Sequence, residues 1–292
     1  MAKRILLFVV TNIAIMVTLS IVLSLLGIGG YVRIDGTLDY AALMVFCLIW
    51  GMAGSFISLQ ISRWMAKHAM GVQLVDGRTG QAELDWLYAT VKQQTDRAGL
   101  PMPEVGVYDS PEVNAFATGP SKRRSLVAVS SGLLRTMRRD EVEGVLAHEV
   151  SHIANGDMVT MALIQGVVNA FVMFFARIVA NIVRNAVDER ISGIVSFLVL
   201  IVMQIALGIL GSMVVAWFSR AREFRADAGA AALAGRDKMV AALRRLQTTT
   251  ALVDPGQPSL ATMKISGARS WLVLLHTHPP LEARIAALQN LR

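Results

Sequence analysis

The chain has 292 residues, of which 54% are hydrophobic and only 17% are charged, and its mean hydropathy is +0.52. This balance excludes an ordinary soluble enzyme and indicates a membrane protein. The net charge of +7 comes from basic residues scattered near apolar runs, without the aromatic interleaving of a nucleic-acid-binding patch. We therefore expect no nucleic-acid partner and expect attraction to the anionic lipids of a bilayer.

Four apolar runs are each near or above the roughly 20 residues that span a bilayer. They cover residues 5–28, 41–61, 159–182 and 191–218. The first run is too long for a removable signal peptide and lacks a small-residue cleavage site, so it is predicted to be a retained anchor. The third run contains polar residues, which would line a bundle interior or would mean that it only dips into the bilayer.

Basic residues around the first two runs predict the orientation of the chain. Lys3 and Arg4 precede the first run, and Arg63 and Lys67 follow the second. The loop between the runs carries Arg33 beside two aspartates. We therefore expect the amino terminus and the segment after the second run to be cytoplasmic.

The segment between the second and third runs is polar and is predicted to form part of a soluble domain. Residues 81–100 carry apolar side chains at helical spacing, and β-like stretches follow at residues 104–110, 114–119 and 124–134. A small sheet is thus followed by a helix, which is an α+β order. The predicted fold is a mainly α membrane protein with a cytoplasmic α+β domain.

The stretch VLAHEVSHIANGD, residues 145–157, is predicted to lie in a helix with clear start and stop signals. Asp140 followed by Glu143 is typical of a capping box, and Asn155 with Gly156 is typical of a helix end. Apolar residues recur at helical spacing between these limits. One face of the helix is therefore expected to enter the core.

Two histidines, His148 and His152, stand four residues apart in this helix, and Glu149 directly follows the first. Residues four apart lie one above the other on the same face, so both imidazoles can bind one metal ion. Zinc suits such ligands best, and the chain's single cysteine lies in an apolar run. H-E-x-x-H is the zinc-protease pattern, in which the glutamate takes a proton from water. The sequence predicts one catalytic zinc ion per chain and Glu149 as the general base.

A catalytic zinc site needs a third protein ligand, and two carboxylates at helical spacing follow the fourth apolar run. Glu223 is the candidate ligand, and Asp227 would orient a ligating histidine. On spacing alone, Glu223 could equally be a solvated acid that pairs with Arg220, Arg222 or Arg225.

Four motifs, together with the placement of the apolar runs, resemble the HtpX-type heat-shock membrane proteases, bacterial relatives of the CAAX prenyl endopeptidases. The motifs are NAFATG from residue 114, HEVSH from residue 148, EFRAD from residue 223 and HTHPPLEARI from residue 276. The resemblance covers nearly the whole chain. It implies that His148, His152 and Glu223 are zinc ligands and that Glu149 is the catalytic carboxylate.

The resemblance also implies roles for residues outside the zinc set. His278 resembles the family's transition-state histidine, with Arg284 as a partner behind the site, and Asn114 would hold substrate backbone along an edge strand. Two simpler readings stay open. His278 could be a structural histidine between helices, and Asn114 could form an Asx turn at the start of an ordinary strand.

The function implied by the resemblance is that of a multi-pass zinc endopeptidase of the bacterial inner membrane, active in stress response and protein quality control. Its partners would be the lipid bilayer and unfolded or misfolded membrane proteins, which it would cut at the cytoplasmic side. The oligomeric state stays open. A protease that trims prenylated peptides and a non-catalytic membrane scaffold with a structural metal remain as alternatives.

The expected domain organisation follows from the apolar runs and the motifs. It comprises a transmembrane hairpin at residues 1–63, peptidase segments at 64–158 and 219–292, and a second hydrophobic hairpin at 159–218.

Overall fold

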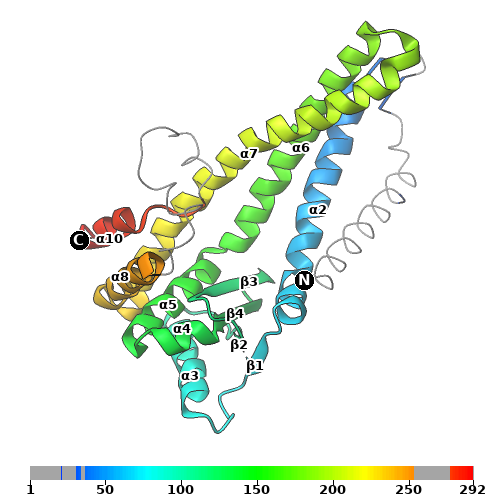
Figure 1. Ribbon diagram of the computed structural model, residues 1–292. Helices are drawn as coiled ribbons and strands as arrows, with labels where there is room; N and C mark the ends of the chain where they lie inside the picture. Colours follow the sequence, from blue (N-terminus) through cyan, green and yellow to red (C-terminus); the bar gives the residue numbers. More distant parts are fainter. Residues whose placement is uncertain (1–20, 22–30, 34–36, 253–276, 292) are drawn as a thin grey trace. The chain divides into compact units, whose positions relative to one another are not determined.

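The computed structural model describes Ile21 and residues 31–33, 37–252 and 277–291 (Figure 1). Apart from Ile21, the first apolar run therefore lies outside the described residues. The chain divides into two compact units. One comprises Met1–Ser58 and Met161–Val215, and the other comprises Leu59–Thr160 and Ala216–Arg292.

Three helices in the described part of the chain are long and apolar enough to cross a membrane. They are α2 (Tyr40–Ala69), α6 (Asp157–Ala186) and α7 (Glu189–Ala234). They contain the second, third and fourth apolar runs, as the sequence predicted. The third run is thus long enough to span a bilayer, in spite of its polar residues.

Small residues let α2 and α6 approach each other closely. A Cβ atom added at Gly51 would lie 2.5 Å from the carbonyl oxygen of Gly166 and 3.0 Å from the Cβ of Ala170. Backbones come this close only where side chains are absent or small, which is the usual contact between helices in lipid.

The second unit contains a four-stranded mixed sheet with the strand order β1-β2-β4-β3 (Figure 1). The outer pairs are antiparallel and the central pair is parallel. The strands are β1 (Gln73–Val75), β2 (Glu104–Tyr108), β3 (Ala115–Ser121) and β4 (Arg124–Ser130). The strand of the NAFATG motif, β3, therefore lies at an edge of the sheet, as predicted, whereas β1 was not predicted.

The third β-like stretch was predicted too long. β4 ends at Ser130, and α4 (Ser131–Thr136) follows it directly. The Oγ of Ser130 accepts a hydrogen bond from the N–H of Leu133 at 3.0 Å, which caps the helix. Ser130 thus ends the strand and caps the helix, so residues 131–134 belong to α4 and not to the strand.

The core of this unit is formed by the sheet, α3 (Ala82–Arg97) and α5 (Arg139–Asn155). The predicted apolar stripe of α5 is buried, since Val142, Leu146, Val150 and Ile153 are each at most 2% exposed. The burial of this stripe turns the opposite side of α5, with its two histidines, away from the core. Hydrophobic burial therefore fixes the rotation of the helix that carries the HExxH motif.

The predicted start of α5 was wrong, although its end was right. The N-cap is Arg138, whose backbone N–H donates to the Glu141 side chain at 2.8 Å. Glu143 instead forms an ion pair with Lys238 of α8 (Arg236–Leu252), a partner that the local sequence does not reveal. At the other end, Gly156 adopts the left-handed conformation of a helix stop.

The carboxyl-terminal helix α10 (Leu281–Gln289) packs on α8. Ile285 and Leu288 of α10 join Leu243 and Met239 of α8 and Ala147 of α5 in one apolar cluster. This cluster attaches the end of the chain to the HExxH helix.

Candidate metal centre

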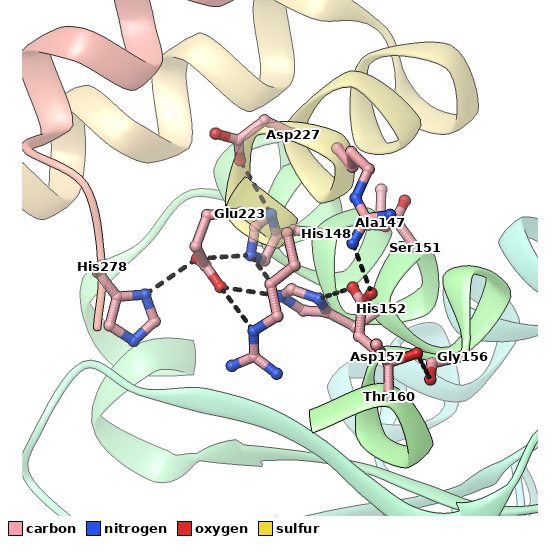
Figure 2. A network of polar contacts seen from close by, with 12 residues as sticks. Ala147, His148, Ser151, His152, Gly156, Asp157, Thr160, Glu223, Asp227 and His278 are labelled. Atoms are coloured by element: carbon pink, nitrogen blue, oxygen red, sulfur yellow. Dashed lines mark hydrogen bonds and ion pairs between the residues drawn. The ribbon is translucent and has the colours of Figure 1, made fainter. Parts of the chain in front are cut away.

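Three side chains from α5 and α7 meet in one buried cluster (Figure 2). The Nε2 atoms of His148 and His152 lie 3.0 Å apart. They lie 3.5 and 3.4 Å, respectively, from the nearest carboxylate oxygen of Glu223. The structure thus brings together the three predicted zinc ligands, and Glu223, which is 1% exposed, is not a solvated surface acid.

Each imidazole is held from its other side by a carboxylate (Figure 2). Asp227 Oδ1 lies 2.9 Å from Nδ1 of His148, and Asp157 Oδ2 lies 2.7 Å from Nδ1 of His152. When Nδ1–H of a neutral imidazole donates to a carboxylate, Nε2 is left with a free lone pair. Both lone pairs then point at the same place, an arrangement that a cation between them would stabilise.

Asp157 was missed by the sequence analysis. It is the first residue of α6, and it is buried next to the helix stop at Gly156. The sequence did contain a signal for this contact. A carboxylate directly after the glycine that ends α5 stays within reach of His152 in the last turn of that helix. Asp227, in contrast, was singled out in the sequence, and it lies beside Nδ1 of His148, where it could orient the ring.

Arg284 of α10 is a buried cation behind the cluster, at 6% exposure. Its Nη2 and Nε donate to the two carboxylate oxygens of Asp227 at 2.6 and 2.7 Å. Its Nη1 lies 3.4 Å from Oε2 of Glu223. The guanidinium thus holds the carboxylate that lies against His148.

His278 lies at the exposed side of the cluster, with 63% of its side chain accessible. Its Nδ1 is 2.9 Å from Oε2 of Glu223 (Figure 2). This exposure does not fit a histidine packed between helices.

Glu149 and Asn114 make no hydrogen bond or ion pair with the three clustered side chains among the described residues. Glu149 is buried in α5 directly after His148. Asn114 is exposed and immediately precedes β3, where its backbone exchanges two hydrogen bonds with Ser130. The catalytic role of Glu149 and the substrate-binding role of Asn114 therefore stay predictions.

The residues of the cluster fit a divalent cation. Burial would raise the pKa of Glu223, but the nearby imidazoles of His148, His152 and His278 lower it far below its usual range. Burial would lower the pKa of His152, but Asp157 and Glu223 raise it to about 9. Oε1 of Glu223 is buried and accepts no hydrogen bond within the described part of the chain. The cluster thus offers two imidazole nitrogens and a buried carboxylate, which is a ligand set that suits a divalent cation.

Comparisons with known proteins identify the family of the chain. Residues 81–292 match the model of Peptidase family M48. The protein is 54% identical to Protease HtpX of Aeromonas salmonicida, over 99% of this chain and all of that protein. It is 53% identical to the Protease HtpX homolog of Bacillus subtilis, over 99% of both chains.

The fold is also similar to the crystal structure of S. mikatae Ste24p, with a TM-score of 0.62 and 19% sequence identity. The similarity covers 99% of this chain and 66% of Ste24p, so this chain spans slightly less than two thirds of that protein. At this identity the likeness shows the fold alone.

The chain belongs to peptidase family M48 and, within it, to the HtpX proteases, which are membrane metallopeptidases. This membership confirms the resemblance found in the sequence. It also implies a bound metal ion and supports a metalloprotease.

A glycine sets the separation between the two helices that carry the clustered side chains. A Cβ atom added at Gly229 of α7 would lie 2.7 Å from Oγ and 2.9 Å from Cβ of Ser151 in α5. The hydroxyl can rotate away, but Cβ of Ser151 cannot. Any larger residue at position 229 must therefore push α7, which carries Glu223, away from the two histidines of α5.

We predict that Gly229→Ala lowers zinc affinity by about ten-fold or more, because a shift of α7 displaces Glu223 from the imidazoles. Adding Ser151→Gly removes both atoms that a new Cβ would meet, so the double variant should recover most of the loss. Zinc affinity is measured by competition with a chelator, and thermal unfolding of the metal-free proteins is the control for general stability. Equal zinc affinities for the wild type and Gly229→Ala would refute this role of the glycine.

Proposed function

We propose that the protein is a zinc endopeptidase that cleaves misfolded or damaged membrane proteins at the cytoplasmic side of the membrane. His148, His152 and Glu223 would hold the zinc ion. One observation supports this proposal above all. The Nε2 atoms of two buried imidazoles lie 3.0 Å apart, beside the carboxylate of Glu223. Two neutral imidazoles and one carboxylate are a usual ligand set for catalytic zinc.

A bound zinc ion would lower the pKa of a water molecule to about 7 and polarise a peptide carbonyl. Glu149, next to His148 in α5, is the proposed general base. It takes a proton from the attacking water as the new C–O bond forms and the carbonyl π electrons move onto oxygen. When the carbonyl re-forms, the C–N bond breaks and Glu149 passes the proton to the leaving amine.

The remaining residues of the site would orient these groups. Asp227 and Asp157 hold the imidazoles in the tautomer that presents Nε2, and Arg284 holds Asp227. His278 lies at the exposed side of Glu223, where a ring N–H could donate to the oxyanion of the reaction.

The edge strand β3 is the proposed binding place for substrate. β3 packs beside α5, and its outer edge has no further strand among the described residues. An extended substrate segment could therefore add to the sheet as a new strand, with Asn114 holding its backbone. Binding through backbone hydrogen bonds depends little on the side chains of the substrate, which suits unfolded substrates of many sequences.

Glu149→Gln and Glu223→Ala should separate catalysis from metal binding. Glu149→Gln keeps the size of the side chain but removes the base, so zinc should bind in about stoichiometric amount while proteolysis stops. Glu223→Ala removes a ligand, so the purified protein should contain little zinc and should be inactive. The measurement is zinc per chain together with cleavage of an unfolded model protein.

Two results would contradict these assignments. Full zinc occupancy in Glu223→Ala would mean that another residue is the third ligand. Cleavage by Glu149→Gln would remove the proposed mechanism.

His278→Ala is expected to lower turnover by about two to three powers of ten, which is the usual effect of removing one oxyanion donor. Because His278 also contacts Glu223, zinc content must be measured in the same preparations. Turnover should remain low when every chain contains zinc. If saturating zinc restores turnover, His278 only supports the ligand.

The proposed orientation of the chain in the membrane rests on the basic residues beside the apolar runs and on the proximity of His148 and Glu223. Because these two residues share one site, the sequence between them must cross the membrane an even number of times. It contains α6 and the apolar part of α7, both long enough to span a bilayer. The basic residues that follow the second apolar run support a cytoplasmic location of the site.

Reporter fusions after Lys67 and at the carboxyl terminus should both report the cytoplasm, and a reporter near Asp35 should report the far side. The measurement compares the activities of a periplasmic and a cytoplasmic reporter at each position. A periplasmic signal after Lys67 would reverse the orientation and move the proposed cleavage to the other side.

A further inference from the structure

One cation next to the cluster has no role in the mechanism described so far. Arg222 directly precedes Glu223 on α7, and its side chain is 25% exposed. Its Nε lies 3.7 Å from Oε1 of Glu223. Both atoms are buried, and neither has a hydrogen-bond partner among the described residues. The guanidinium thus lies beside the candidate ligand without being fixed to it.

Arg284 differs from Arg222 in this respect, because two hydrogen bonds fix it to Asp227. Arg225 lies 3.7 Å from Asp157 and is 62% exposed, so it is a surface residue and not part of the buried cluster. Within the described residues, the only carboxylate within 4 Å of Arg222 is that of Glu223. Arg222 therefore loses its counter-charge if Glu223 gives its negative charge to a metal ion.

A cation in this position opposes the binding of zinc, because like charges repel at short distance in a partly buried site. The same charge becomes favourable when negative charge develops beside the metal ion. Peptide hydrolysis creates such a charge, since the carbonyl oxygen becomes an oxyanion when water adds to the carbonyl carbon. Arginine offers several N–H donors from one planar group, which suits it to an oxygen anion.

We propose that Arg222 is a catalytic residue that donates a hydrogen bond to the oxyanion, together with His278. This inference rests on the proposed zinc peptidase function. Its buried Nε lies beside Glu223, and a quarter of the side chain is exposed. In the proposal, the Nη atoms at the end of the guanidinium are the ones that reach the substrate. The residue would stabilise the transition state and would add little to the binding of substrate in the ground state.

The test compares Arg222→Gln, Arg222→Lys and the wild type. Arg244→Gln is the matched control, because it removes the same charge from an exposed position on α8. The substrate is an internally quenched peptide built on a site that the wild type cleaves in an unfolded model protein. Turnover and KM are measured at saturating zinc, and zinc affinity is measured by chelator competition.

Arg222→Gln should lower kcat by about ten- to a hundred-fold with KM within about two-fold of the wild type, since only a transition-state contact is lost. Its zinc affinity should stay equal or rise, by up to about ten-fold, because a repelling charge is removed. Arg222→Lys should keep part of the turnover. A fall in kcat with a rise in metal affinity is a combination that loss of structure would not produce.

Three outcomes would overturn the proposal. Unchanged kcat in Arg222→Gln would make the residue a counter-charge for Glu223 only. Weaker zinc binding would make it a support for the ligand. A higher KM with unchanged kcat, most of all for acidic peptides, would make it a contact to substrate in the ground state. In all three cases an active wild type beside an inactive Glu149→Gln variant would leave the peptidase function intact.

Discussion

The two hydrogen bonds that hold the imidazoles at Nδ1 are the interactions on which the site depends. Asp227 and Asp157 lie 2.9 and 2.7 Å from Nδ1 of His148 and His152, and in neutral imidazoles these contacts leave both Nε2 lone pairs facing Glu223. Without these carboxylates the rings could rotate or change tautomer, and the lone pairs would no longer meet. The four-residue spacing within α5 brings the two rings close together. The carboxylates at Nδ1 determine whether each ring turns its Nε2 atom toward Glu223.

These partners come from separate parts of the chain, and apolar packing brings them together. α5 is fixed by its buried stripe, and α10 is attached through Ile285 and Leu288. Arg284 of α10 then reaches Asp227, which lies one turn after Glu223 on α7. One face of α7 therefore supplies both a candidate ligand and the carboxylate that orients another. The hydrophobic core determines the geometry of a site that contains almost no hydrophobic residues.

Features encoded by local sequence were predicted well, and features that depend on distant partners were not. The stripe of α5, its glycine stop and the edge strand β3 follow from periodicity and turn chemistry. The start of α5 was misplaced because Glu143 pairs with Lys238, far away in sequence. The strand β1 was missed because three residues are too few to show alternation. The domain boundaries and the roles of the site residues remain predictions.

The same carboxylates that orient the imidazoles make the metal-free site unfavourable. Glu223, Asp227, Asp157 and Glu149 are all buried, and Arg284 is the one arginine of the site that is buried with them. Taking charges out of water costs free energy unless a partner compensates for it. Arg284 compensates for only part of the negative charge of these carboxylates, and a divalent cation would compensate for more of it. Metal binding and the close packing of α5, α7 and α10 should therefore stabilise each other. The arrangement that prepares the site for a metal ion should thus also make the folding of the peptidase unit depend on that ion.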